Sequence, residues 1–210
     1  MKKIPTRGEL QQYRTNSPGS TEGLTQPLYH YQTYALAGTT TQYTFFQVPV
    51  GQSSLTYEDT NMESAGQMPS PKAFLVTGIQ LVMLPTVNPS IQGAQAVDAF
   101  VNDVYNLGKA GYLKFFVGSR DYLIDGPVGK FTQQFGVVGF SSAADVTTAG
   151  AAAQHRTSMG AWRGKYYEIT PVVLERNMNF NVTLNFPTTA AVSANIRIGM
   201  ILDGILYRGG

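Results

Sequence analysis

The stretch that decides the fold is NMNFNVTLNF, residues 177–186, in which polar and apolar side chains alternate. The apolar set is Met178, Phe180, Val182, Leu184 and Phe186, and the polar set is Asn177, Asn179, Asn181, Thr183 and Asn185. Successive side chains of a β-strand point to opposite faces, so this period predicts a strand with one buried and one solvent-facing side. A second alternating stretch, NIRIGMILDGILYR (195–208), follows closely, and we expect the two to form an antiparallel pair.

The composition is consistent with a single all-β domain that makes extensive contacts. Of the 210 residues, 43% are hydrophobic, which is enough for a core. Only 13% are charged, about half the usual share of a soluble domain. We interpret the low charge as favouring contacts with other subunits, with a neutral, Thr-rich β surface as the alternative. The chain has no Cys, which excludes disulfides, thiolate metal sites and cysteine nucleophiles.

The first residues are polar and basic. They lack the apolar stretch of a signal peptide, and no run in the chain is long enough to cross a bilayer, so we expect a soluble, non-secreted protein. Residues 1–14 carry +3, four bases (Lys2, Lys3, Arg7 and Arg14) against one acid, while the remaining eleven bases and twelve acids give −1. We predict an extended N-terminal arm over residues 1–27. Its bases are candidates for contact with nucleic acid or with a neighbour's acidic surface, and a merely mobile terminus is the alternative.

The rest of the chain, residues 28–210, is predicted to form one jelly-roll-like β-sandwich with one inserted helix and long loops. Strands are expected at 28–36, 41–50, 72–85, 111–119, 120–125, 130–140, 166–176, 179–186 and 195–208. The segment 72–85 is apolar on both faces, which indicates a central strand. Helical periodicity predicts a helix over 94–107 with Gly108 as its C-cap. We expect loops at 51–71, which is polar, and at 141–165, which is rich in Ala and Gly.

The residues that could carry catalysis are few. His30 lies in an alternating segment and is interpreted as a packed or edge histidine, and His155 lies in the Ala-rich loop. Two distant histidines and no cysteine leave too few ligands, so we predict no bound transition metal and no other cofactor. Asp121 and Asp125 would share one face of a strand and are candidates for glycoside hydrolysis, although ordinary ion pairing is the simpler interpretation.

Two further segments have suggestive compositions. YEDTNME (57–63) clusters Glu58, Asp59 and Glu63, but it lacks the ligand spacing of a calcium loop, so a solvated loop is favoured. GAWRGKYY (160–167) combines Trp162, Arg163, Lys165 and Tyr166. These residue types suit stacking on a sugar or base, and they equally suit a contact between proteins. A Trp packed under a loop is the third interpretation.

Taken together, the basic arm, the sandwich with a helix in one connection, the long neutral loops and the closing IRIGMILDGILYRGG (196–210) resemble the jelly-roll coat proteins of viruses, bacteriophages in particular. The resemblance is architectural and covers residues 25–210. It implies a structural virion protein, a capsid subunit that self-assembles into a homo-oligomeric shell with other virion proteins. The chain would then not be an enzyme, and it would assemble in the host cytoplasm. The arm would face inward, toward the genome or an internal membrane, or clasp a neighbour.

Two alternatives from other classes stay open. The first is a phage decoration, spike or adhesion module that binds glycan, through Trp162, Arg163 and the nearby tyrosines, or another capsid protein. The second is a glycan-active enzyme that uses Asp121 and Asp125.

Overall fold

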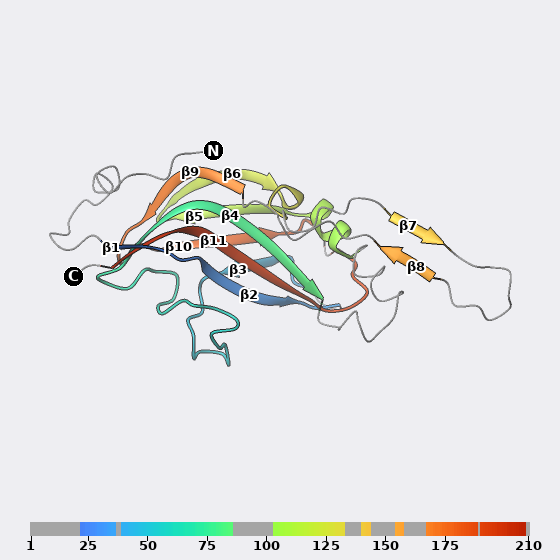
Figure 1. The fold of residues 1–210 in the computed structure, drawn as a ribbon, viewed down its shortest axis with the longest axis horizontal. Helices are drawn as coiled ribbons and strands as arrows, with labels where there is room; N and C mark the ends of the chain where they lie inside the picture. The colour runs from blue at the N-terminus through green and yellow to red at the C-terminus, as the bar shows by residue number, and fades with distance from the viewer. Residues whose placement is uncertain are drawn as a thin grey trace.

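The fold is an all-β sandwich. The computed structural model describes residues 22–36, 39–85, 103–132, 140–143, 154–157, 167–188 and 190–208. Within them, two antiparallel sheets enclose one hydrophobic core, and a single helical segment is present (Figure 1). This confirms the predicted all-β sandwich.

The larger sheet is built on two long strands. β4 (Ala73–Pro85) and β11 (Ile196–Arg208) are 13 residues each and run antiparallel, side by side, along the length of the sandwich (Figure 1). β9 (Tyr167–Leu174) pairs with the other edge of β4. On the far side of β11, β2 (Leu28–Tyr34) and β1 (Glu22–Thr25) occupy successive lengths of the same edge.

The smaller sheet has four strands in the order β3 (Gln42–Phe45), β10 (Phe180–Asn185), β5 (Tyr112–Val117) and β6 (Arg120–Pro127). A separate two-stranded sheet joins β7 (Phe140–Ala143) to β8 (Gln154–Thr157). The helical residues 103–110 directly precede β5, and a 3-10 turn, η1 (Val128–Lys130), directly follows β6.

The strand pairing is nested. Leaving aside β7 and β8 and the short β1, the chain pairs β2 with β11, β3 with β10, β4 with β9 and β5 with β6. The first strand thus pairs with the last, the second with the one before the last, and so on inward. Successive pairs alternate between the larger and the smaller sheet. The backbone follows the path of one long hairpin that is wrapped around the core.

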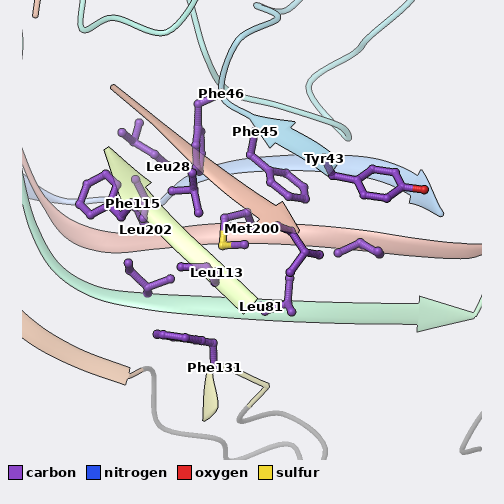
Figure 2. Close-up of a cluster of buried hydrophobic side chains, with 14 of the residues drawn as sticks. Leu28, Tyr43, Phe45, Phe46, Leu81, Leu113, Phe115, Phe131, Met200 and Leu202 are labelled. Atoms are coloured by element: carbon purple, nitrogen blue, oxygen red, sulfur yellow. The ribbon is translucent and has the colours of Figure 1, made fainter. Parts of the chain in front are cut away.

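The core lies between the two sheets. Figure 2 shows side chains of β5 and β3 in the smaller sheet close to side chains of β11 and β4 in the larger one. The predicted inward face of the opening stretch is confirmed, because Phe180, Val182, Leu184 and Phe186 are all buried in this core. Full burial of one such side chain stabilises the fold by about 1.5–3 kcal/mol. The core therefore supplies most of the stability of this cysteine-free chain.

A β-bulge accounts for part of the apolar pattern of β4, in which both odd and even positions face the core. Phe74 and Val76 face the core before Thr77, whereas Ile79, Leu81 and Met83 face it afterwards, so the inward positions change parity. The register skips Thr77, since Gly78 is opposite Asp203 and Val76 is opposite Gly204. A β-bulge shifts the alternation by one residue in this way. The prediction of a central strand is confirmed by the pairing with β11 and β9.

The predicted pairing of the last two strands is wrong. β10 belongs to the smaller sheet and β11 to the larger one, and residues 186–195 cross from one to the other. Both strands do have one buried face, and these faces meet across the core instead of lying side by side. Alternation reports that a strand has a buried face, but it carries no information about which strand lies beside it.

Four boundaries also differ from the sequence predictions. Residues 22–25, assigned to the arm, form β1 and pair with the end of β11. The helix continues past Gly108 to residue 110, so Gly108 is not its C-cap, and residues 94–102 lie outside the described part. The sequence predicts a strand at 130–140, but residue 130 is the last residue of η1, and residues 133–139 are not described. The segment 141–165 contains most of the β7–β8 pair. Sequence periodicity is least informative at the ends of helices and strands, because capping and tertiary contacts determine where an element stops.

The bulge region gives a stability prediction. A Cβ on Gly204 would lie 2.0 Å from the carbonyl oxygen of Leu75, and backbone cannot move aside cheaply, so Gly204→Ala should cost about 3 kcal/mol or more of unfolding free energy. Gly108→Ala is the matched control. A Cβ there meets Gly129 at an ordinary 3.8 Å, and Ala in a helix interior gains about 0.5–1 kcal/mol over Gly. Urea denaturation of both variants checks this, and equal midpoints would contradict it.

Candidate functional site

The most elaborate polar arrangement in the described residues lies at the edge of β2, where the connection from β3 to β4 folds back. Residues 59–61 of this connection extend the larger sheet past β2. Tyr31 N donates to Asp59 O at 2.7 Å, and Tyr29 N donates to Asn61 Oδ1 at 3.0 Å. An exposed strand edge can pair with another chain. Here that edge is covered from Tyr29 to Tyr31.

An arginine fastens the same connection to β11. Arg197 Nη2 donates to Asp59 Oδ1 at 2.9 Å and to Glu58 O at 2.6 Å. Its guanidinium carbon lies 4.7 Å from the ring centroid of Tyr31, a cation–π arrangement. Hydrogen bonds from Thr56, chiefly from its backbone N–H, hold the pKa of Asp59 below its usual value, and Arg197 adds to the effect.

Tyr31 can lie flat on the sheet because the residue beneath it has no side chain. A Cβ on Gly199 would lie 2.2 Å from the Tyr31 ring. Partial burial raises the pKa of the Tyr31 phenol, with Arg197 acting in the opposite direction. Gly199, Tyr31 and Arg197 therefore form a stack on the outer side of the larger sheet. Asp59 completes it through its ion pair with Arg197.

His30 holds the start of the connection from inside the sandwich. It is 1% exposed, and its Nδ1 accepts the backbone N–H of Phe46 at 2.7 Å. Phe46 directly follows β3 in a left-handed conformation (φ 69°), and the rings of Phe45 and Phe46 stand edge-on to the imidazole. Burial lowers the pKa of His30 to about 4, against a smaller opposing effect of Asp59. The interpretation of His30 as a packed histidine is confirmed.

A shallow hollow of about 380 Å³ opens beside this arrangement. Tyr31, Thr33 and Arg197 line one side, and Val48 and Leu55 line another. The alternation of β2 directs the backbone N–H and C=O of Thr33 to the same edge as those of Tyr31. Within the described residues, no backbone hydrogen bond or β-bridge continues the pairing of residues 59–61 as far as Thr33. The hollow offers an apolar wall, a short length of strand edge and the Ser53 hydroxyl, but it is not lined by three His, Asp or Glu side chains that could hold a metal ion.

Two carboxylates of this connection, Glu63 and Asp59, are held in ion pairs. Glu63 binds Lys72, with Lys72 Nζ 2.7 Å from Glu63 Oε2, and Asp59 binds Arg197. Across the described part of the chain, no three His, Asp or Glu side chains are grouped so that they could hold a metal ion. The same part contains no helix with the length and hydrophobicity needed to span a membrane.

The remaining predicted site residues are not brought together by the described structure. Trp162, Arg163, Lys165 and Tyr166, and the arm bases Lys2, Lys3, Arg7 and Arg14, lie outside the described residues. Asp121 and Asp125 lie in β6, and His155 lies in β8, but their side chains are not described. Those assignments stay predictions.

Sequence reasoning missed Asp203 altogether and the partner of Arg197. Arg197 and Asp59 are 138 residues apart, and no local pattern links them. Asp203 Oδ2 is buried and has no hydrogen-bond partner in the described structure, and burial raises the pKa of this carboxyl. A signal for Asp203 did exist: it is the one acidic residue in the apolar stretch GMILDGIL (199–206).

The polar face of β10 is less exposed to solvent than its asparagines suggest. Thr183 is buried and accepts a hydrogen bond from Asn185 Nδ2 at 3.0 Å, and Asn181 Oδ1 is buried without a hydrogen-bond partner in the described residues. β10 lies between β3 and β5, and its short side chains are flanked there by longer ones, such as Lys114 opposite Thr183.

Comparison with known proteins adds no assignment. No protein-family model matches the chain, and no curated protein or solved structure is significantly similar to it. Any function must therefore be argued from the residues and their geometry.

His30 gives a pH prediction. The unfolded chain binds a proton at His30 below about pH 6.5, whereas the folded chain does so only near pH 4. Stability is therefore lost as the pH falls through this window, by about 3 kcal/mol in total at 1.4 kcal/mol per pH unit. His30→Asn keeps an acceptor near the position of Nδ1 but does not titrate, so its stability should fall less. Urea denaturation at pH 7, 5.5 and 4 measures the difference. Parallel pH profiles would contradict the prediction.

A second prediction concerns the Arg197–Asp59 ion pair. Arg197→Gln should release residues 56–61 from β11, so that chymotrypsin cleaves several-fold faster after Tyr57, whose exposed fraction is 69%. The global unfolding free energy should change by about 1 kcal/mol or less, because the ion pair is partly solvated. Lys72→Gln is the control, since it breaks an ion pair of the same connection away from residues 59–61. Equal cleavage of both variants would refute the fastening role.

Proposed function

We propose that this chain is a jelly-roll coat subunit, a structural virion protein that assembles with copies of itself into a shell. The observation that carries the proposal is the nested pairing. Numbering the main strands one to eight in chain order, with β1 and β2 as one, gives the sheets 1-8-3-6 and 2-7-4-5. Jelly rolls are double-sheet structures of eight strands with two Greek keys, found in viral capsid proteins among others. This strand order is what wrapping one long hairpin around a core produces.

Because one fold serves many functions, the proposal also needs support from the surface. Charge is scarce at 13% of residues, which lowers the desolvation cost when copies approach one another. Among the described residues, no group of three His, Asp or Glu side chains could hold a metal ion, so nothing in this geometry favours a metalloenzyme. These properties suit a protein whose surface is made for contact with other protein.

We assign the contacts between copies to loops at the ends of the sandwich and not to strand edges. The edge of β2 is covered from Tyr29 to Tyr31 by residues 59–61, and edge pairing between copies would give open aggregates instead of closed symmetry. Tyr57 is exposed in the same connection. Together with the segment 141–165, Trp162 and Arg163, it is a candidate contact residue.

Electron microscopy and light scattering of the purified protein test the proposal. Shell-like particles are expected, and a wild type that stays monomeric at high concentration would overturn it. A monomer or trimer that binds carbohydrate would instead favour an adhesion or decoration module.

The Trp162→Ala, Arg163→Ala double variant tests the assigned contact. Aromatic and Arg anchors buried in an interface contribute about 2 kcal/mol or more each. The variant should therefore keep the circular dichroism of the wild type but assemble only at higher concentration. Unchanged assembly would remove these two residues from the contact.

A further inference from the structure

A small cavity opens at the end of the sandwich, beside β1 and the end of β11 (Figure 1). Its volume is about 60 Å³. The floor is apolar and consists of four side chains of the core, each at most 5% exposed: Leu28, Met62, Met68 and Leu206. The charged residues of its described lining are Glu63, Lys72 and Arg208. The cavity therefore brings charged groups to the place where the hydrophobic core reaches the surface.

Arg208 reaches this cavity because it lies on the inner side of β11. Met200, Leu202 and Leu206 point into the core, and successive side chains of a strand alternate between its two faces. Arg208 comes two residues after Leu206, so its side chain lies on the same face, at the point where the core ends. It is exposed there, and it makes no hydrogen bond or ion pair with another described residue. Its guanidinium is a donor group that needs an acceptor.

Lys72 supplies the second cation of the cavity. Its Nζ lies 2.7 Å from Glu63 Oε2, and the two side chains are 26% and 51% exposed. Both carboxylate oxygens of Glu63 accept from Lys72, which engages at most two of the three donors of an ammonium group. At least one donor of Lys72 is therefore left. Two cations and one carboxylate give the described lining a formal charge of +1.

We propose that this cavity binds a monocarboxylate with a short alkyl chain. The carboxylate binds Lys72 and Arg208, because charge-assisted hydrogen bonds from ammonium and guanidinium groups are the strong ones for this group. The alkyl chain lies on the floor of Leu and Met side chains, which removes methylene groups from water. A lining of +1 matches one negative charge, whereas phosphate would bring additional charge close to Glu63 and leave the apolar floor unfilled.

The carboxylate can belong to a small molecule or to an acidic side chain of a second copy, since both present the same group. The inference concerns the single subunit and does not depend on whether it assembles into a shell.

Methyl NMR of the full chain with isotope-labelled methionine tests the proposal. Met62 and Met68 line the cavity, whereas Met83 and Met200 are buried elsewhere in the core. Sodium propionate, added at constant ionic strength against chloride, should shift the Met62 and Met68 signals saturably and leave the other two in place. Acetate should bind about fourfold more weakly, because it lacks one methylene group. No saturable shift, equal binding of acetate and propionate, or tighter binding of phosphate would overturn the proposal.

Charge variants show which groups hold the carboxylate. Arg208→Gln and Lys72→Gln should each weaken propionate binding about tenfold, as expected for loss of a charge-assisted hydrogen bond. Lys109→Gln is the control, since Lys109 lies in the helical segment and does not line the cavity. Unchanged Met83 and Met200 signals report that each variant is folded. Unaltered binding in both cavity variants, or equal weakening in the control, would show that these cations do not form the site.

A further variant tests whether Arg208 is available. Glu22 is opposite Arg208 in the pairing of β1 with β11. Glu22→Gln should leave propionate binding nearly unchanged, because a solvated charge pair contributes little. A gain of about tenfold or more would mean that a carboxylate of the chain itself already holds Arg208, and this would overturn the site.

A dilution series without added carboxylate distinguishes the two sources of the ligand. If an acidic side chain of a second copy enters the cavity, the wild-type Met62 and Met68 signals should move as the protein concentration rises, and those of Arg208→Gln should not. If they stay constant while propionate shifts them, the ligand is a small molecule.

Discussion

The pairing of β4 with β11 is the constraint on which the rest of the structure depends. Twelve residue pairs join them, and every other strand of the larger sheet attaches to one of the two. Their inward side chains, such as Leu81 and Met200, form one wall of the core (Figure 2). The bulge at Thr77 lets two 13-residue strands stay paired while the sheet curves, because a bulge bends a strand and increases its twist.

The nested pairing also determines the order in which strand pairs can form during folding at low entropic cost. β5 and β6 are separated by a two-residue turn, whereas β2 and β11 bring together the two ends of the described chain. Loop closure costs more for longer loops, although slowly. Each inner pair shortens the loop that the next pair must close. We therefore infer that folding proceeds outward from the pairing of β5 with β6, and that β4 and β11 pair late.

Local periodicity predicted what depends on local burial and missed what depends on distant partners. The buried face of β10 and the packed His30 could be predicted, because each follows from the side chains of a short segment. The sheet to which β10 belongs could not, since its neighbours β3 and β5 are distant in the sequence. The same is true of the candidate site, where Asp59 and Arg197 meet across 138 residues. Gly108 misled because it lies inside the helix, which continues to residue 110, so a glycine near the end of a helical pattern does not by itself mark the C-cap.

The two outer faces of the sandwich differ, and this difference matters for a protein with so little charge. The smaller sheet presents Asn185 and Lys114, whereas the larger sheet presents Ile201 and Ile205 on either side of the part-exposed Asp203, whose Oδ2 is buried. Low charge weakens the repulsion that keeps proteins apart, so open edges and apolar faces must be controlled by structure. Residues 59–61 cover one edge in this way. On the outer face of the larger sheet, Leu75 and Val82 are likewise only 1% and 3% exposed, so little apolar surface is left open at these positions.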